Sequence, residues 1–417
     1  MAPLPSVKSL AAAVAAVTAA RDRHRERHRP TGFGFALADG IDFLDGTRWD
    51  GLTKSASGLL ARPYLRVLEE LGPENLAPRY AMVFRGRNPV AAIAAQSVRI
   101  DFDRLRKGGK PSALGRLEER VLVCGNLLCW GFHGVAFAEG EDRASLWPAV
   151  AEALYRLRRA DRLSGDTDFV LVKDLPEEER GPAEALSRFS YRAVETEPDM
   201  VLSLDPRWKT YDDYLGALSA KYRKGAVKIA KVVAAAGGTV ETLQGSALWP
   251  HAERLHALYL DVHREARLRL FTLPQDFLPS LAESFGDAFR CTLLRVDGED
   301  SEIAGFVTTL RDRDGVLGYH IGFDRKRNEE LPLYFRLLQL CVADAIALGG
   351  RRLSLGRTAL EPKARLGARP EPLHVFLRHR VPMLNAVVRA VLSGVHHDEA
   401  PERNPFKEKK GETPPEA

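Results

Sequence analysis

Short apolar runs and longer amphipathic stretches alternate along the first half of the chain. The apolar runs are rich in Val, Ile, Phe and Tyr, which favours strands, whereas residues 145–159 have a helical period with basic residues near its end. The predicted strand regions are 80–84, 90–100, 121–137 and 168–172. Residues 86–89 contain both glycine and proline, which predicts a tight turn between the first two strands. This half therefore predicts a strand hairpin, a third strand, a helix and a short strand.

The same order of elements returns in the second half. Residues 333–347 have the period of a helix, and the apolar runs around them predict strands. These strands are expected at 289–296, 303–311, 316–323 and 352–355. The third strand region carries similar residues in both halves, Gly131-Phe132-His133 and Gly318-Tyr319-His320. We infer two copies of one domain that meet near residues 198–206. The fold class is then α/β (mixed α+β), and each copy has a central mixed sheet flanked by helices.

The two ends of the chain differ in composition from the copies. Residues 1–34 contain an Ala-rich stretch followed by a dense run of charges, which predicts an N-terminal helix with a solvated end rather than an export signal. Residues 393–417 are charged and rich in proline, without periodicity, which predicts a disordered tail. The first domain is therefore expected at 35–200, and the second, with the active site, at 201–392.

A long helix is predicted between the copies over residues 211–236, with a stop at Gly237-Gly238. Its buried stripe consists of apolar and aromatic residues at helical spacing: Tyr211, Tyr214, Leu215, Leu218, Tyr222, Ala226, Ile229 and Val233. Its opposite face carries four lysines: Lys221, Lys224, Lys228 and Lys231. These ammonium groups either bind phosphate groups of RNA, of a nucleotide-linked substrate or of a cofactor, or they form an ordinary solvated face.

Composition and missing motifs narrow the function classes. The 417 residues are 45% hydrophobic and 28% charged, with a formal net charge of +5 that is too small to indicate nucleic-acid binding by itself. No apolar run is long enough to span a membrane, and the chain is expected to be cytoplasmic, with its four cysteines reduced and buried. The sequence lacks the phosphate loop, the dinucleotide fingerprint, the serine-hydrolase elbow and the H-E-x-x-H helix. These absences argue against the corresponding enzyme classes, and no metal site is predicted.

A charged connection between two predicted strands occupies residues 351–380. Gly356 and Gly367 bracket a loop that contains Lys363, and residues 373–379 predict the second strand. Loops held by a rigid scaffold often carry function. The alternative is a set of surface charges on a β-hairpin connection.

Taken in order, these features resemble the GNAT acyltransferase superfamily. They are the Tyr- and Lys-rich helix ending in Gly-Gly, the strand with Tyr319-His320-Ile321-Gly322 followed by the 333–347 helix, and Gly356-Arg357-Thr358 followed by Lys363-x-x-x-Gly367. More specifically, the chain is similar to the two-domain branch, which is related to the Fem-type peptidoglycan aminoacyl transferases and the CelD/BioF2-like acetyltransferases. The resemblance is strongest over residues 200–380.

The resemblance implies two tandem GNAT-like domains, the first degenerate, and transfer of an acyl group from a thioester or an aminoacyl ester to a primary amine. It places Lys363 in the acceptor channel, where a preorganised cation stabilises the developing oxyanion. His320 is expected either as the general base or as a core histidine bonded to a backbone carbonyl. Tyr319 and Tyr334 are expected to position the substrate or relay the proton.

The donor is left open because one family feature is missing. The family normally holds the pyrophosphate of acetyl-CoA on a glycine-rich loop that opens the helix after this strand, but residues 324–332 contain no glycine. Acyl-CoA and aminoacyl-tRNA both remain candidate co-substrates, and no bound cofactor is expected. Phosphate contacts are then expected from basic side chains: Arg325, Lys326, Arg327, Arg357, Lys224 and Lys228.

The resemblance also leaves the partners open. The acceptor amine is expected on a peptide, a cell-wall or lipid precursor, or a small molecule, and tRNA is a candidate partner. The alternative is a non-catalytic, degenerate GNAT pair that binds RNA or an acidic surface through the basic helix.

Overall fold

The computed structural model describes residues 29–101, 118–265, 269–297, 302–381, 383–385, 401 and 403–407, with six isolated residues between positions 15 and 25. The predicted N-terminal helix and C-terminal tail lie largely outside these residues. In the described part, no helix combines the length and the apolar character needed to cross a membrane. All four cysteines are buried and carry free thiols, as predicted.

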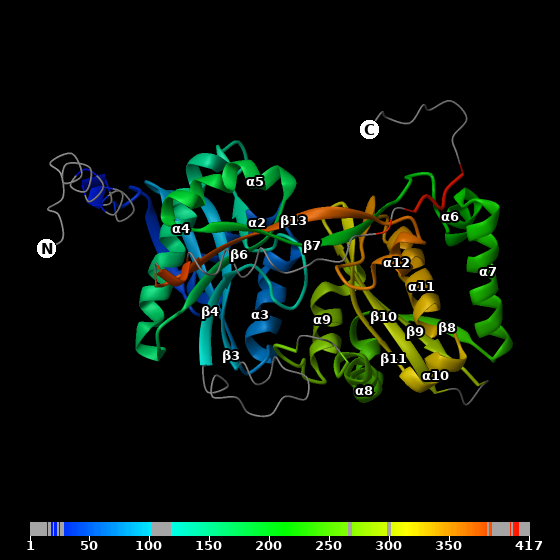
Figure 1. The fold of residues 1–417 in the computed structure, drawn as a ribbon. Coiled ribbons are helices and arrows are strands. Elements are labelled where there is room, and N and C mark those ends of the chain that lie inside the picture. Colours follow the sequence, from blue (N-terminus) through cyan, green and yellow to red (C-terminus); the bar gives the residue numbers. More distant parts are fainter. Residues whose placement is uncertain are drawn as a thin grey trace, which may run out of the picture.

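One mixed β-sheet of thirteen described strands runs through both halves of the molecule (Figure 1). The strands are β1 (Gly34–Ala38), β2 (Leu76–Arg85), β3 (Asn88–Asp101), β4 (Glu118–Cys124), β5 (Val135–Phe137), β6 (Phe169–Pro176), β7 (Arg192–Ser203), β8 (Thr239–Leu243), β9 (Phe289–Arg295), β10 (Ile303–Asp312), β11 (Gly315–Phe323), β12 (Arg352–Ser354) and β13 (Arg369–His379). Their order is β1-β2-β3-β4-β6-β13-β7-β12-β11-β10-β9-β8, and β5 pairs with β3 beside this path.

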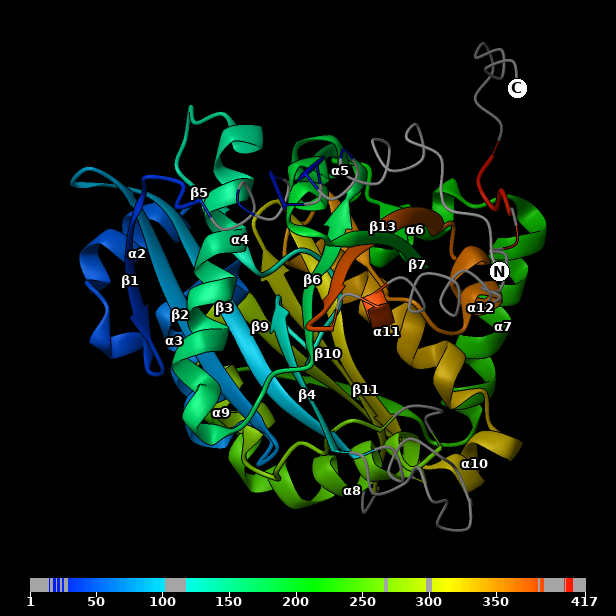
Figure 2. The same ribbon diagram turned by 60° about the vertical axis from the view of Figure 1, so that its left-hand side comes forward.

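Helices pack on the sheet along its length, and Figure 2 shows α4 crossing in front of the strands of the first half. The helices are α2 (Gly46–Thr53), α3 (Arg62–Leu71), α4 (Arg143–Ala160), α5 (Glu177–Ala183), α6 (Tyr211–Ala217), α7 (Ala220–Ala235), α8 (Ala252–His263), α9 (Phe277–Phe285), α10 (Arg325–Glu330), α11 (Leu333–Ala347) and α12 (Leu360–Ala364). The predicted helix at 145–159 corresponds to α4, and α11 has the predicted bounds.

The two halves share one order of elements, as the sequence predicts. In the first half, β1 to β4 pair antiparallel, and α4 then crosses over to β6, which is parallel to β4. In the second half, β8 to β11 pair antiparallel, and α11 crosses over to β12, which is parallel to β11. A parallel pair requires such a crossover, and a helix supplies it in both copies. The similar residue triplets, however, lie in different elements. Residues 131–133 lie in the loop after β4, whereas residues 318–320 lie within β11. The prediction that this match falls at equivalent positions is therefore wrong.

Two long strands join the halves. In Figure 1, β7 and β13 run from one half to the other. The first part of β13 pairs with β7, and its later part lies between β6 and β7, so a strand from late in the chain enters the sheet beside β6. At Val201, β7 pairs with β13 on one edge and with β12 on the other. The interpretation of residues 351–380 as a β-hairpin connection is therefore wrong, because β12 and β13 are separated by β7.

The predicted long helix is broken. The chain forms α6 and α7 with two extended residues, Leu218 and Ser219, between them. Leu218 forms a β-bridge with Phe406, and the backbone N–H of Ser219 donates to the carbonyl of Pro405 at 2.8 Å. These contacts hold the backbone out of the helical conformation, and their partners are too distant in sequence for periodicity to indicate them. The predicted stop is confirmed, because Gly237 follows α7 with a φ of +71°.

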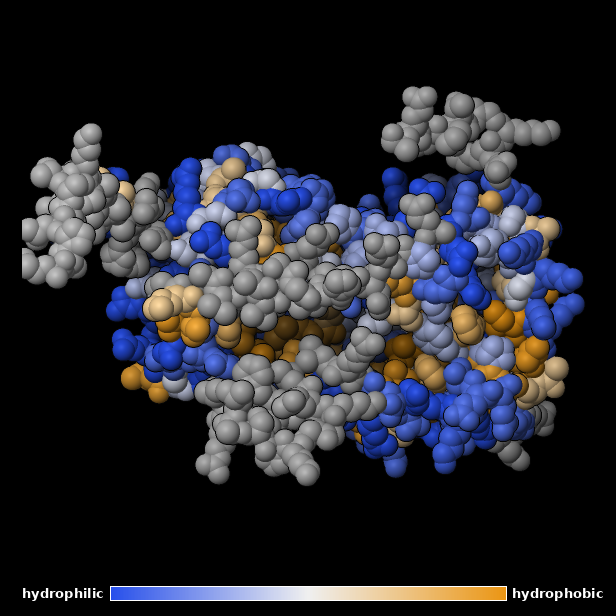
Figure 3. Space-filling view, in the orientation of Figure 1, coloured by the Kyte–Doolittle hydropathy of each residue, from blue (hydrophilic) through white to orange (hydrophobic). Residues whose placement is uncertain are grey.

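Polar and apolar contacts both cross between the halves. One hydrophobic cluster contains Tyr64 from the first half and Tyr319 from the second. Asp312 accepts from the backbone N–H of Gly58 at 2.7 Å and from the Ser57 hydroxyl at 3.2 Å, and the Ser57 and Asp312 side chains are buried at this junction. Figure 3 shows apolar side chains gathered along the middle of one face, between more polar margins.

Candidate active site

The candidate site begins where two parallel strands of the second half diverge. β11 pairs with β12 only from Gly315 to Leu317, although β11 continues to Phe323. A cavity of about 680 Å³ lies between the later part of β11 and the segment that carries α12. Its walls come from both halves. The residues that line it with a polar group or an aromatic ring include Trp130, Tyr259, His263, Phe271, Tyr319, His320, Phe323, Asn328, Tyr334, Phe335, Thr358 and Lys363.

The cavity brings together the four predicted catalytic residues. Tyr319 and His320 come from β11, Tyr334 from the first turn of α11, and Lys363 from the last turn of α12. Their roles stay predictions, but their shared position agrees with the sequence-based expectation that they serve one site.

Lys363 is buried, with 5% of its surface exposed. Its Nζ donates a hydrogen bond to the carbonyl oxygen of Gly356 at 3.0 Å. Burial lowers the pKa of Lys363 to about 8, and the nearby carboxyl of Asp199 opposes this shift. The side chain is therefore mostly protonated at neutral pH and places a desolvated positive charge at the cavity wall. Lys363 is therefore not one of a set of exposed surface charges.

A buried polar chain supports the backbone beside Lys363. Asp199 accepts from the backbone N–H of Gly356 at 2.9 Å and from the Ser354 hydroxyl at 2.5 Å. The indole N–H of Trp130, from the first half, donates to that same hydroxyl. Because each partner is fixed by another, the Gly356 carbonyl that receives Lys363 is held in place.

His320 lines this cavity and has a ring nitrogen without a hydrogen-bond partner among the described residues. Its Nε2 is buried and has no hydrogen-bond partner among the described residues, so the contact with a backbone carbonyl expected of a core histidine is not seen there. Burial, and then the neighbouring His263, lower the pKa of His320 to about 4. Its backbone N–H is held by the Thr308 hydroxyl at 2.8 Å. The imidazole is therefore neutral at pH 7.

The two tyrosines differ in their surroundings. The pairing of β10 with β11 shifts between Thr308 and Thr309, which leaves Tyr319 as the extra residue of a β-bulge. The Tyr319 hydroxyl lies 3.5 Å from the Tyr64 hydroxyl of the first half, and burial raises its pKa well above the usual value. Tyr334 packs against aromatic rings at the cavity wall, and burial raises its pKa to about 12. Both hydroxyls are therefore protonated at neutral pH.

The segment that opens α11 has its own partners for its backbone amides. The Asp324 carboxylate accepts from the amides of Lys326 and Arg327, at 2.9 and 3.1 Å. The side-chain oxygen of Asn328 accepts from the amide of Tyr334 at 2.9 Å. Backbone amides bind phosphate when they are bare, and these three are occupied by side chains of the same segment.

The predicted phosphate-binding residues do not gather at the cavity. Arg327 forms ion pairs with Asp297, Glu302 and Asp324, and the neighbouring Arg325 and Lys326 are exposed on α10. None of these three cations is among the residues that line the cavity.

The remaining predicted cations lie elsewhere in the fold. Arg357 forms an ion pair with Asp174 of the first half, a fully buried carboxylate, and also donates to Thr196. Lys224 and Lys228 are exposed on α7, and Lys228 borders a groove between α7 and α11.

Sequence reasoning missed three residues of the site: Trp130, Asp199 and His263. Trp130 and Asp199 reach the site through the packing of one half against the other, which periodicity within either half does not indicate. His263 carries a weak signal, because it follows Tyr259 by one helical turn and their rings stack at 5.1 Å.

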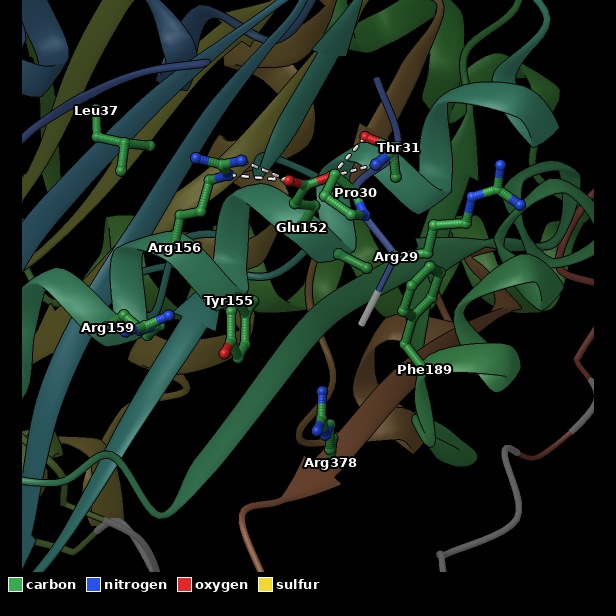
Figure 4. Close-up of a pocket in the computed structure, with 11 residues that line it drawn as sticks. Arg29, Pro30, Thr31, Leu37, Glu152, Tyr155, Arg156, Arg159, Phe189 and Arg378 are labelled. Carbon is green, nitrogen blue, oxygen red and sulfur yellow. Dashed lines mark hydrogen bonds and ion pairs between the residues drawn. The ribbon is translucent and has the colours of Figure 1, made fainter. Parts of the chain in front are cut away.

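The first half holds a cavity of a different kind. About 490 Å³ in volume, it lies beside α4 and is lined by Arg29, Tyr155, Arg156, Arg159, Phe189 and Arg378 among others (Figure 4). The carboxylate on its wall, Glu152, accepts from the amide and hydroxyl of Thr31 at 2.7 and 2.6 Å and also from Arg156 at 2.7 Å. Unlike the cavity beside β11, it has no lysine among its lining residues.

Comparison with known proteins agrees with this architecture. A family model described as an acetyltransferase (GNAT) domain matches residues 220–364, from the start of α7 to the end of α12. Over 272 residues, or 64% of its length, the chain is 27% identical to the putative 8-amino-7-oxononanoate synthase 2 of Mycobacterium tuberculosis. The chain spans about a third, 34%, of the length of these curated relatives.

Two solved structures share the fold at low sequence identity. The tandem GNAT protein from the clavulanic acid biosynthesis pathway is 14% identical, with a TM-score of 0.50 over 84% of this chain and 99% of that one. FemX is 8% identical, with a TM-score of 0.54 over 85% of this chain and 99% of that one. The predicted fold class is thereby confirmed. Residues 220–364 match the model of a GNAT acetyltransferase domain, and the chain shares its fold with a tandem GNAT protein and with FemX.

Proposed function

We propose that the second half transfers an acyl group from a thioester or an aminoacyl ester to an amine, within the cavity between β11 and α12. The observation that carries this proposal is Lys363, a buried cation on the wall of a cavity in the GNAT domain. Burying a charge is costly, so a lysine kept in such a place calls for a compensating role. Stabilising negative charge at a reacting carbonyl is such a role.

The proposed reaction needs one cation and one proton acceptor. The amine attacks the carbonyl carbon, the C–N bond forms, and the negative charge that develops on the oxygen is stabilised by the Lys363 ammonium. The nitrogen becomes strongly acidic as it is acylated, and the neutral imidazole of His320 accepts its proton. The C–S or C–O bond then breaks, and that proton passes to the leaving sulfur or oxygen.

The two tyrosines then have positioning roles. Tyr334 is placed by α11 at the cavity wall and would orient the substrate through its protonated hydroxyl. The Tyr319 hydroxyl faces Tyr64, and we assign this tyrosine to the joint between the halves. The proton relay suggested for these tyrosines is not needed in this scheme.

The identity of the acyl donor is tested most simply by measuring which candidate donors bind to the protein. Three backbone amides of the segment that opens α11 have side-chain partners, so a CoA donor would bind through side chains and through its acyl group. Calorimetric titrations with acetyl-CoA and decanoyl-CoA, followed by thiol release with a panel of amines, should detect a thioester donor. If neither thioester binds, transfer from charged tRNA is the next assay. Failure of both assays would overturn the proposed activity.

One observation favours a second candidate, a non-catalytic function of α7. The four lysines on its outer face are exposed, and no ion pair is formed by them among the described residues. Such a face would bind RNA or an acidic surface with an affinity that falls as salt rises. Binding that is insensitive to salt, or unchanged when Lys224 and Lys228 are replaced by glutamine, would contradict this candidate.

A further inference from the structure

The cavity between β11 and α12, here named the transfer cavity, adjoins a second hollow of about 830 Å³. Four residues belong to the walls of both: His263, Leu270, Phe271 and Leu273. The wall between them is fixed by α8, because His256 Nε2 lies 3.0 Å from the Leu273 carbonyl and the Tyr259 hydroxyl accepts from the Leu273 N–H at 3.3 Å. The two hollows therefore keep a defined position relative to each other.

The two hollows differ in charge. Among the described residues that line the transfer cavity there is no carboxylate, and at neutral pH the positive charge on its wall is that of Lys363. Most of the other lining residues are apolar, such as Leu128, Phe271 and Leu338. The second hollow is lined by three arginines, Arg99, Arg264 and Arg269, and by one carboxylate, Glu74.

Arg269 is the cation best placed to act on a ligand. It is half-buried, and it forms no ion pair with any described residue. Its charge acts on His263, in the shared wall, where it adds to the effect of burial in lowering the pKa of that histidine. Arg264 has a weak partner, the Asp261 carboxylate at 3.7 Å, and both of these side chains are largely exposed. Two guanidinium groups are therefore available beside the transfer cavity.

We propose that the two hollows bind one amphiphilic substrate, with an apolar chain in the transfer cavity and a phosphate group on Arg264 and Arg269. The inference rests on the proposed transfer site and adds the substrate class. Apolar pockets of several hundred Å³ bind ligands mainly through the apolar area they bury. An acetyl group would leave most of 680 Å³ unfilled, whereas a chain would fill it. Guanidinium groups bind phosphate through paired hydrogen bonds.

The charge of the cavity also excludes one kind of ligand. An alkylammonium group would lose its hydration beside Lys363 without gaining a carboxylate partner among the described lining residues. An acceptor amine must therefore enter this cavity in its neutral form. A cationic amphiphile of the same chain length is then the matched negative probe.

The test measures binding and does not depend on turnover. Dodecyl phosphate and dodecyltrimethylammonium, both below their micellar concentrations, are titrated calorimetrically into the full chain at low and moderate salt. We expect saturable binding of dodecyl phosphate that weakens with salt and is about tenfold tighter than that of the ammonium probe. Equal affinity for the two probes would overturn the proposal.

Variants locate the phosphate. Arg264→Gln together with Arg269→Gln should weaken dodecyl phosphate binding about tenfold. When Arg269→Lys takes the place of Arg269→Gln in this double variant, part of the affinity should return. Arg87→Gln, at an exposed arginine in the turn between β2 and β3, is the matched control and should change nothing. An unchanged affinity in the double variant would also overturn the proposal.

A competition arm separates the two sources of such a ligand. If decanoyl-CoA displaces dodecyl phosphate and also loses affinity in the double variant, the bound substrate is a phosphate-bearing thioester donor. If dodecyl phosphate binds but is not displaced, the source is a lipid phosphate, and both results support the proposal. Lys363→Met should abolish transfer but keep dodecyl phosphate binding. If the double arginine variant loses dodecyl phosphate binding but keeps full transfer activity, the proposed reaction still holds. The proposal that its substrate is a phosphate-bearing amphiphile is then contradicted.

Discussion

The side-chain nitrogen of Lys363 lies 3.0 Å from the carbonyl oxygen of Gly356, and the N–H of Gly356 lies 2.9 Å from the Asp199 carboxylate. Both backbone groups of this glycine are thus bonded to buried, ionisable side chains. Trp130 of the first half lies against the same glycine and donates to Ser354 beside it. The position of Lys363 in the second half therefore depends on an aromatic residue of the first.

This arrangement predicts that Gly356→Ala is destabilising. Gly356 has a φ of +79°, and an added Cβ would lie 3.0–3.1 Å from the Trp130 ring. We expect a loss of about 1–3 kcal/mol in the free energy of unfolding, measured by chemical denaturation, with a fall in transfer rate. Gly349→Ala is the matched control, because Gly349 has a similar φ of +70° but no neighbour within 4 Å. Equal losses in the two variants would show that the contact with Trp130 has no role.

The transfer rate should depend on pH through two groups. Lys363 stabilises the oxyanion only when protonated, so kcat/KM should fall as the pH rises through about 8. His320 accepts a proton only when neutral, so the rate should fall as the pH drops through about 4. Lys363→Arg should retain part of the rate and lose the upper limb, since a guanidinium stays charged. An upper limb that persists in this variant would assign that limb to another group.

Lys363 should reduce the stability of the fold. Its pKa is lower in the folded state, about 8, than the usual 10.5, so the folded protein binds the proton less tightly than the unfolded chain. The difference corresponds to about 3 kcal/mol at neutral pH. Lys363→Met, of similar shape, should therefore raise the free energy of unfolding by about 1–3 kcal/mol.

The sign of this effect has its own pH signature. The advantage of Lys363→Met over the wild type should be full below pH 8 and disappear as the pH approaches 10.5, where the lysine is neutral in both states. Urea titrations of both proteins across this range measure it. A variant that is less stable than the wild type at pH 7 would show that the ammonium is better compensated than its burial suggests.

The ion pair between Arg357 and Asp174 should hold the halves together. Asp174 is fully buried, so Arg357→Met leaves its carboxylate with Lys173 as the remaining cationic partner. We expect a loss of about 2–4 kcal/mol, measured in a double-mutant cycle with Asp174→Asn. The exposed pair of Arg352 and Glu371 is the control, and Arg352→Met should cost less than about 1 kcal/mol. If Arg357→Met instead keeps full stability but weakens substrate binding, the sequence-based prediction of a phosphate ligand is the better one.

Local patterns in the sequence predicted much of the fold. Strand hairpins, both crossover helices and the stop after α7 follow from periodicity and turn residues, which act over a few positions. The break between α6 and α7 could not be predicted in this way, because it depends on a bridge between Leu218 and Phe406. The entry of β13 into the sheet beside β6 is likewise a long-range pairing.

The residues of the candidate site also fall into two groups, those that the local sequence indicated and those that long-range packing brings into place. Lys363, His320 and Tyr334 lie in segments whose order resembles a known family, so sequence could indicate them. Trp130 and Asp199 reach the site only through packing between the halves and the pairing of β7 with β12. Arg357, predicted as a ligand of phosphate, lies in a buried ion pair, because its partner comes from a strand of the other half.

The role of Lys363 in acyl transfer is tested most directly by comparing the transfer rate of Lys363→Met with that of the wild type. Thiol release from decanoyl-CoA, with the amine panel, or transfer from charged tRNA, gives kcat/KM for both proteins, and thermal unfolding gives their Tm. We expect a fall of at least about 100-fold in kcat/KM with a Tm that is equal or higher. A variant that transfers at the wild-type rate would contradict this role.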